Sequence, residues 1–244
     1  MMRIDILSLF PDYFKGPFDE SIIGRACKSG KVEIVLHDIR DYAEGKHRKV
    51  DDRPYGGGPG MLLMAPPLVK AIRNLHSPKC RRIYLSPQGK MLTPELALEL
   101  SQYEHLLFVC GHYEGIDQRV IDSEIDEEVS IGPYVLSNGC AAAIVVVDAL
   151  LRFVPGVLGN AESFKEDSFQ EGVLDWPHYT RPPEFEGKRV PDVLLEGHHK
   201  KIDAWRQKEA LEKTILMQAA SLDVETHGAK NELNDSSVGG EKNE

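Results

Sequence analysis

The sequence predicts an α/β fold in which a largely parallel sheet is covered by helices on both faces. Three stretches, 82–89, 105–115 and 129–157, share one form, in which an apolar strand ends in a loop rich in Gly, Pro or polar residues. Strands that alternate with helices favour a parallel sheet with covered faces. Loops that leave the carboxyl ends of neighbouring strands face one crevice, so these three loops predict a single small-ligand site.

Periodicity and turn residues place the other elements in order. Apolar and β-branched runs predict strands at 4–10, 31–37, 82–85, 105–109 and 127–131. Helical spacing predicts helices at 19–28, 66–76, 94–100, 117–121 and 141–151. The helix at 94–100 also has an N-cap and a first-turn proline at Thr93-Pro94. Between them, 41–60 is polar, basic and glycine-rich but lacks the Gly-Lys-Ser/Thr of a P-loop, so it is either a functional loop or a flexible one.

Composition divides the chain into four parts. We expect a ligand-binding domain at 1–159, a polar linker at 160–181 and a small, mostly helical domain at 182–223. In that domain, 198–220 has helix-forming composition with apolar residues near helical spacing. The acidic tail at 224–244 is rich in Gly, Asn, Ser and charge and is expected to be disordered.

The overall composition is that of an ordinary globular protein, with 41% hydrophobic and 28% charged residues among 244. The longest apolar run, 141–151, is far shorter than the roughly 20 residues that cross a bilayer, and no membrane partner is expected. Asp5 falls where a signal peptide would be apolar, which argues for the cytoplasm. The four cysteines lie far apart without a C-x-x-C pair, so we expect reduced thiols and no metal site.

Net charge does not decide whether the chain binds nucleic acid. The formal charge is −10, of which the tail from Asp223 carries −4. Basic residues cluster at 46–49, 79–82 and 198–201, and phosphate contacts need such clusters. An RNA partner is therefore neither established nor excluded by charge alone.

Seven motifs, in this order, resemble the bacterial tRNA (guanine-N1)-methyltransferase family. They are Ser21-Ile-Ile-Gly-Arg-Ala26, His47 with 50–61, Tyr84-Leu-Ser-Pro-Gln-Gly89, Cys110-Gly-His-Tyr-Glu-Gly-Ile-Asp117, Pro155-Gly-Val-Leu-Gly159, Glu166-Asp-Ser-Phe169 and Pro177-His-Tyr-Thr-Arg-Pro182. The resemblance covers roughly residues 1–220. It implies the SPOUT type of parallel sheet with a deep trefoil knot, a homodimer, S-adenosylmethionine (SAM) as cofactor and use of Mg²⁺. The absence of G-x-G-x-x-G after an early strand agrees, since it disfavours a Rossmann-type methyltransferase.

The resemblance also assigns cofactor-binding residues to the three loops. They are Tyr84, Leu85 and Pro87 in the first loop, Gly111, Tyr113 and Glu114 in the second, and Ile131, Gly132, Pro133, Tyr134, Val135 and Leu136 in the third. Glycines let the backbone approach a ligand closely, and apolar neighbours supply a pocket with few polar anchors.

Asp167 matches the family's general base and Arg152 its catalytic arginine. Guanine N1 carries a proton and becomes nucleophilic only when that proton leaves, and negative charge then builds on O6. Asp167 would accept the proton while Arg152 stabilises O6. Without the resemblance, Asp167 would be interpreted as a solvated linker acid or an N-cap, and Arg152 as the basic end of a helix.

Three residues of the third loop depart from the family pattern. Pro133, Asn138 and Cys140 stand where the family usually has Asp, Gly and Glu. Pro133 removes a backbone donor, and Asn138 must adopt whatever backbone angle the glycine took. These changes bear on cofactor affinity and loop geometry more than on the reaction.

The sequence therefore predicts SAM-dependent methylation of N1 of the guanosine at position 37 of tRNA, immediately 3′ of the anticodon and preceded by another guanosine. Expected partners are tRNA and a second copy of the chain, without DNA. Phosphate contacts are assigned to Lys46, Arg48, Lys49, Lys200 and Lys201. Two alternatives remain, namely a related SPOUT enzyme with another RNA target and an RNA-binding protein that has lost catalysis.

Overall fold

The computed structural model describes residues 1–158 and 172–235, with side chains described at 1–158 and 172–218. The chain forms two compact units, Met1–Ala161 and Glu162–Glu244.

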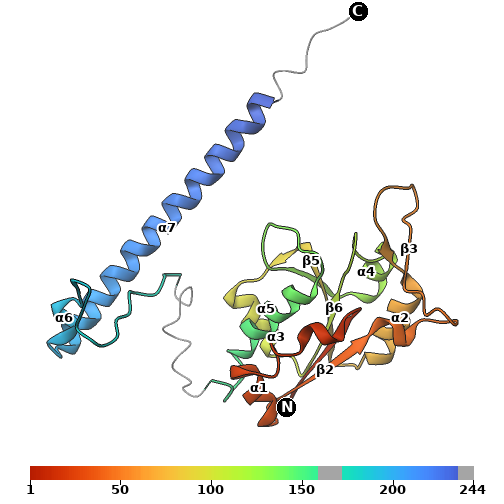
Figure 1. Ribbon diagram of the computed structural model, residues 1–244, viewed down its shortest axis with the longest axis horizontal. Helices are drawn as coiled ribbons and strands as arrows, with labels where there is room; N and C mark the ends of the chain where they lie inside the picture. Colours follow the sequence, from red (N-terminus) through yellow and green to blue (C-terminus); the bar gives the residue numbers. More distant parts are fainter. Residues whose placement is uncertain (159–171, 236–244) are drawn as a thin grey trace, which may run out of the picture. The chain divides into compact units, whose positions relative to one another are not determined.

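The first unit is built on one five-stranded sheet (Figure 1). Its strands, in spatial order, are β2 (Val32–Asp38), β1 (Met2–Ser8), β6 (His105–Cys110), β5 (Cys80–Met91) and β7 (Glu127–Ser130). Every neighbouring pair is parallel. The prediction of a parallel sheet is confirmed, and the carboxyl ends of β5, β6 and β7 lie side by side at one edge.

Helices cover both faces of this sheet. One face packs against α1 (Ser21–Lys28), α3 (Pro94–Ser101) and α5 (Cys140–Leu151), and the other against α2 (Ala65–Leu75) and α4 (Gln118–Glu124). Along β6, Leu106 and Phe108 enter the first core while Leu107 and Val109 enter the second, all fully buried. Because both faces of each central strand are apolar, the strands appear in the sequence as continuous hydrophobic runs.

The glycine-rich stretch 41–60 is more structured than predicted. Its first two residues belong to a short 3₁₀ helix, Ile39–Tyr42. Further along, it contains β3 (Asp51–Asp52), which pairs antiparallel with β4 (Leu62–Leu63). Two-residue strands give no periodic signal, which is why the sequence did not predict this hairpin.

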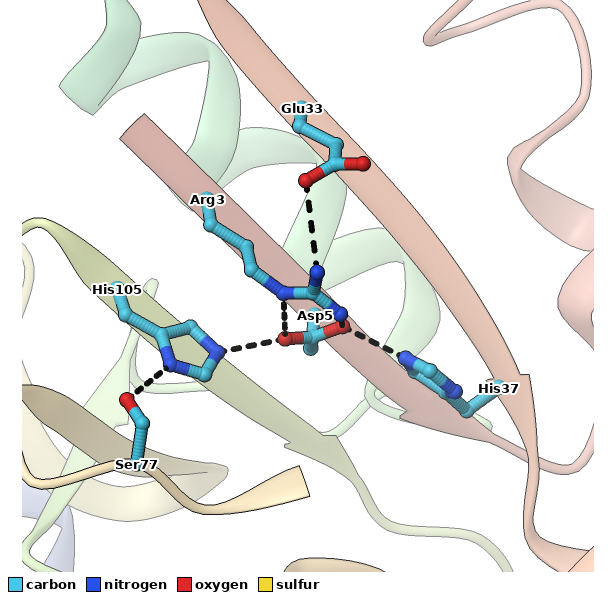
Figure 2. A network of polar contacts seen from close by, with 6 residues as sticks. All are labelled: Arg3, Asp5, Glu33, His37, Ser77 and His105. Atoms are coloured by element: carbon cyan, nitrogen blue, oxygen red, sulfur yellow. Dashed lines mark hydrogen bonds and ion pairs between the residues drawn. The ribbon is translucent and has the colours of Figure 1, made fainter. Parts of the chain in front are cut away.

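A polar network lies within the sheet around Asp5, whose side chain is fully buried (Figure 2). The carboxylate accepts two hydrogen bonds from Arg3, at 2.8 and 2.9 Å. It also contacts Nε2 of His37 at 2.7 Å and Nε2 of His105 at 2.5 Å, and Nδ1 of His105 lies 2.8 Å from Oγ of Ser77. Partners on three elements thus satisfy a charge that would otherwise be costly to bury.

The second unit has a hairpin of β8 (Glu184–Phe185) and β9 (Lys188–Arg189), a short helix α6 (Asp192–Leu195) and the long helix α7 (His199–Asp235). The amide of Leu174 donates to Oγ1 of Thr214 at 2.8 Å, and Arg206 lies over the ring of Trp176 at 4.7 Å. The helix predicted at 198–220 is present but longer, and it continues into the segment expected to be disordered. The Ala, Glu and Lys residues of that segment are good helix formers, which the prediction underweighted.

Several apolar residues of α7 are exposed. Leu211, Ile215 and Leu216 are more than half exposed, although their spacing suggested a core face, while Ala210 and Thr214 are the buried positions between residues 199 and 218 of the helix. No helix in the described part of the chain is both long enough and apolar enough to cross a membrane.

Candidate active site

The irregular middle of β5 and the loops that follow β6 and β7 line one pocket. Its wall consists of Tyr84, Leu85, Ser86 and Pro87, of Gly111, His112, Tyr113, Glu114 and Gly115, and of Val129, Ser130, Ile131, Gly132, Tyr134, Val135, Leu136, Ser137, Asn138, Gly139 and Ala142. The three loops therefore meet at the edge of the sheet where the sequence predicted a ligand site.

The first loop is shaped by an irregularity in β5. Its pairing with β7 shifts register between Leu85 and Lys90, so the segment between them bulges out of the ladder. Gly89 lies against β7 there, where an added Cβ would stand 2.4 Å from the carbonyl carbon of Glu128. A side chain does not fit at this position, and the glycine permits β5 to rejoin β7 beyond the bulge.

The second loop turns sharply after β6. Gly111 packs against the buried Tyr84, whose hydroxyl would lie 2.8 Å from a Cβ at Gly111. Tyr113 has a φ of +58°, in the left-handed region that non-glycine residues seldom adopt. The amide of Glu114 donates to the carbonyl of Met61 at 3.1 Å, which ties this loop to the segment preceding β4.

The third loop is held by hydrogen bonds to its own backbone. Oγ of Ser130 accepts from the amide of Gly132 at 3.2 Å and donates to the carbonyl of the same residue at 3.1 Å. The hydroxyl of Tyr134 donates to the carbonyl of Ile131 at 3.1 Å. Together these bonds fold the loop back on itself beside the pocket.

Asn138 and Cys140, two of the residues that depart from the family pattern, have different positions at the start of α5. Oδ1 of Asn138 accepts from the amide of Cys140 at 2.8 Å, which satisfies the first free amide of α5, whose N-cap residue is Gly139. Asn138 is not among the residues of positive φ in the described chain, so its backbone angle is one that a non-glycine residue adopts without strain. Cys140 is fully buried behind the pocket, at the first position of α5.

Eleven of the twelve residues assigned to the cofactor line the pocket. The exception is Pro133, which is exposed and is not part of the pocket wall. Sequence reasoning missed Ser86, His112, Gly115, Val129, Ser130, Ser137, Asn138, Gly139 and Ala142. Adjacency to the assigned residues was the available signal, since all nine lie in or next to the same three loops.

Two pocket residues have perturbed acid–base properties. Burial, with the nearby carboxylate of Glu128, raises the pKa of Tyr84 to about 12, so its phenol stays neutral. Burial and the neighbouring cation of Arg40 lower the pKa of His112, which favours the neutral imidazole. The ring of His112 lies 5.0 Å from that of Phe10, and its buried Nε2 has no hydrogen-bond partner among the described residues.

The predicted catalytic pair is not assembled at the pocket by the described residues of one chain. Arg152 is the C-cap of α5, whereas the pocket contacts the amino end of that helix through Gly139 and Ala142. Arg152 lies ten residues beyond Ala142, so it is about 15 Å along the helix axis from the nearest pocket residue of α5. Asp167 lies outside the residues that the structure describes.

The five residues assigned to tRNA phosphates are all exposed. In the first unit, Arg48 pairs with Asp41, and Nζ of Lys49 lies 2.8 Å from Asp52, while Lys46 precedes both on the same loop. In the second unit, Lys200 and Lys201 are in the first turn of α7, and Nζ of Lys201 lies 3.3 Å from Glu196. Within residues 1–158 and 172–218, no group of three or more His, Cys, Asp or Glu side chains is placed to hold a metal ion.

Comparison with known proteins places this site in a family. The family model described as tRNA (Guanine-1)-methyltransferase TrmD matches residues 2–222. A tRNA (guanine-N(1)-)-methyltransferase of Protochlamydia amoebophila is 58% identical over 213 residues, which are 87% of this chain and 96% of that protein. The proteins of the same name from Chlamydia muridarum and Chlamydia pneumoniae are 57% and 55% identical over 87% of the chain, which spans 60% and 59% of their greater length. The chain therefore belongs to the tRNA (Guanine-1)-methyltransferase TrmD family.

Proposed function

We propose that this protein transfers a methyl group from SAM to N1 of the guanosine at position 37 of tRNA. The observation that carries the proposal is that the irregular segment of β5 and the loops after β6 and β7 meet in one pocket, in a chain of the TrmD family. The relatives named above are called tRNA (guanine-N(1)-)-methyltransferases, which supports the reaction type and the RNA substrate.

The pocket residues fit a cofactor of this kind. Gly111, Gly132 and Gly139 bring bare backbone to the pocket wall, and a side chain at any of them would lie 3.0 Å or less from a neighbouring atom. Ile131, Val135 and Leu136 supply apolar surface beside them. Backbone amides and carbonyls next to apolar side chains suit the edge and the faces of an adenine ring.

The chemistry divides between two side chains. SAM, when bound, supplies an electrophilic methyl group. Asp167 accepts the N1 proton of guanine, and Arg152 donates hydrogen bonds to O6 as negative charge develops there. An aspartate of ordinary pKa, about 3.9, is a weak base, so the arginine must lower the cost of removing the proton. The two residues therefore act as one unit.

The position of Arg152 supports a homodimeric enzyme. A side chain about 15 Å along α5 from its own pocket is better placed to serve the pocket of a second copy. A symmetric dimer would supply two such composite sites. We also retain the trefoil knot in the first unit, which the family resemblance supports.

The substrate is engaged outside the pocket as well. We assign phosphate contacts to Lys46, Arg48 and Lys49 in the first unit and to Lys200 and Lys201 in the second. The target guanine leaves its stack to reach the methyl group, as base-modifying enzymes require. A preceding guanosine, Mg²⁺ dependence and action in the cytoplasm, where tRNA is found, complete the proposal.

The decisive experiment measures transfer of a labelled methyl group from SAM to unmodified tRNA that has two consecutive guanosines at the anticodon boundary. We expect the label at guanine N1 of the second guanosine, and loss of transfer with Asp167→Ala. An otherwise identical tRNA with the first guanosine changed to adenosine tests the sequence preference, and a chelator tests the requirement for Mg²⁺.

Two results would redirect the proposal. Label on another RNA, with this tRNA left unmodified, would favour a related enzyme with a different target. Binding of tRNA without any transfer would favour an RNA-binding protein, and the altered third loop with Pro133, Asn138 and Cys140 would then be the first place to look for the cause.

A further inference from the structure

Two buried cysteines lie side by side beneath the pocket. Cys110 is the last residue of β6, directly before Gly111, and Cys140 is the first residue of α5, directly after Gly139. Both thiols are fully inaccessible to solvent, and they share a hydrogen bond. Each cysteine is thus the chain neighbour of a glycine that lines the pocket.

The backbones that carry these thiols are fixed against each other. The amide of Gly139 donates to the carbonyl of Gly111 at 2.9 Å, and His112 forms an antiparallel bridge with Asn138. A Cβ added at Gly139 would lie 3.0 Å from Cα of Cys110, so the two segments are in direct contact. This proximity satisfies the first geometric demand of a disulfide, which is that the two backbones lie close together.

Two features of Cys140 favour its thiolate, although the thiol is fully buried and peroxide reaches it only when the loops above it open. Hydrogen bonds with Cys110 and with Oγ of Ser8, the latter at 3.2 Å, lower the pKa of Cys140 to about 7 although burial opposes the change. Its place at the start of a twelve-residue helix also favours a thiolate. The pKa of Cys110 is raised by its hydrogen bond with Cys140 and by burial, so Cys110 keeps the shared proton.

The other two cysteines lack these features. Burial raises the pKa of Cys80 to about 11, and burial with the nearby Asp19 raises the pKa of Cys27. Among the described residues, neither Cys27 nor Cys80 has a second thiol as a partner, and both are free thiols. They serve as internal references for the pair.

We propose that Cys110 and Cys140 form a redox-active pair, which hydrogen peroxide converts into a reversible disulfide across the base of the pocket. The thiolate of Cys140 attacks one peroxide oxygen, the O–O bond breaks, and sulfenic acid and water form once the leaving hydroxide takes up the displaced proton. The sulfur of Cys110 then attacks the sulfur of Cys140, forming the S–S bond and releasing a second water. Two thiols are oxidised and one peroxide is reduced to two waters.

A disulfide would change the pocket above it. The two sulfurs must move from hydrogen-bond contact to covalent bonding distance, which pulls the bases of the second and third loops together. Gly111 and Gly139 move with them, and both line the pocket. Resting on the proposed function, we expect SAM affinity to fall about tenfold or more on oxidation and to recover after dithiothreitol.

Peptide mapping of the full-length protein tests the pair independently of cofactor binding. The protein is treated with peroxide, denatured with an alkylating reagent present and digested without reductant. We expect a peptide linking Cys110 to Cys140, with Cys27 and Cys80 alkylated, and a return to four alkylated cysteines after dithiothreitol. Four alkylated cysteines after peroxide, a disulfide involving Cys27 or Cys80, or irreversible oxidation of Cys140 without a link would each overturn the proposal.

Single variants separate the linkage from its consequence. Cys110→Ser and Cys140→Ser should abolish the linked peptide, while the matched control Cys27→Ser should retain it. SAM titrations compare each variant with its own reduced form, so a change in basal affinity does not enter the result. A linked peptide without loss of affinity would disprove the effect on the pocket, whereas a protein that never binds SAM would refute the proposed function and leave the disulfide result standing.

Discussion

The backbone amide of Gly139 donates to the carbonyl oxygen of Gly111 at 2.9 Å, which joins the third pocket loop to the second. Both glycines are pocket residues, and neither tolerates a side chain without displacing a neighbour. A pocket wall made of paired bare backbone is rigid before any ligand arrives, and this lowers the entropic cost of binding. The same pairing makes the site sensitive to small substitutions.

Gly111→Val should abolish most SAM binding while leaving the fold intact. The new side chain meets Tyr84, which is only 7% exposed and has no room to move away. We expect affinity to fall at least tenfold, or about 1.4 kcal/mol, by titration calorimetry. Gly45→Ala is the control, because Gly45 lies outside the pocket and an added Cβ there meets no atom within 4 Å, even though Gly45 has a positive φ and Gly111 does not. Equal affinity in Gly111→Val and the wild type would show that SAM binds elsewhere.

Gly89→Ala should destabilise the first unit. The added methyl group would stand 2.4 Å from a backbone carbon of Glu128 and 2.5 Å from the amide nitrogen of Val129, and backbone in a sheet moves little. Overpacking of this kind costs about 1–3 kcal/mol, to be measured by urea denaturation. An unchanged midpoint would mean that β5 and β7 separate freely beyond the bulge.

Asp5→Asn should cost about 3 kcal/mol at neutral pH, since removing one member of a buried charged network leaves its partners uncompensated. Burial alone would raise the pKa of Asp5, but hydrogen bonds from His37, Arg3 and His105 outweigh it and lower the pKa well below its ordinary value. A depressed folded-state pKa adds stability that is present above the unfolded value, about 3.9, and is lost below it. The difference in the free energy of unfolding between Asp5→Asn and the wild type should therefore shrink as the pH falls below about 4.

Glu33→Gln is the matched control for the Asp5 experiment. Glu33 contacts the same Arg3 at 3.4 Å, but its side chain is 46% exposed, and exposed ion pairs contribute little. Denaturation curves of both variants at neutral and acidic pH should show a large, pH-dependent effect for Asp5→Asn alone. Comparable effects for the two substitutions would show that the network is not held by its buried carboxylate.

The sequence predicted what depends on local pattern and missed what depends on strand order. The strand predicted at 105–109 is observed at His105–Cys110, because a strand buried on both faces is continuously apolar. That β6 lies between β1 and β5 has no local signal, and the contact of Asp5 with His105 follows only from that order. The sequence alone marks Asp5 only as an acid near the amino terminus.

The site shows the same division. Most pocket residues were predicted because the three loops share recognisable motifs. Ser130 and Asn138 were missed as pocket residues because their side chains bond to nearby backbone, a role that depends on the final loop geometry. The separation of Arg152 from its own pocket was implicit in the length of the apolar helix, since each residue advances the helix by about 1.5 Å.

Mixing two variants that each lack methyl transfer at a low SAM concentration tests whether Arg152 acts on the pocket of a second copy. One variant carries Arg152→Ala with an intact pocket, and the other carries Gly111→Val with an intact Arg152. In a mixed dimer, the intact pocket of the first meets the intact arginine of the second, so one of its two sites is complete. Random exchange of subunits should then restore about a quarter of wild-type methyl transfer. If Arg152 instead acted on its own pocket, no combination would contain a complete site and the mixture would stay inactive. Because Arg152 lies about 15 Å along α5 from that pocket, we expect recovery.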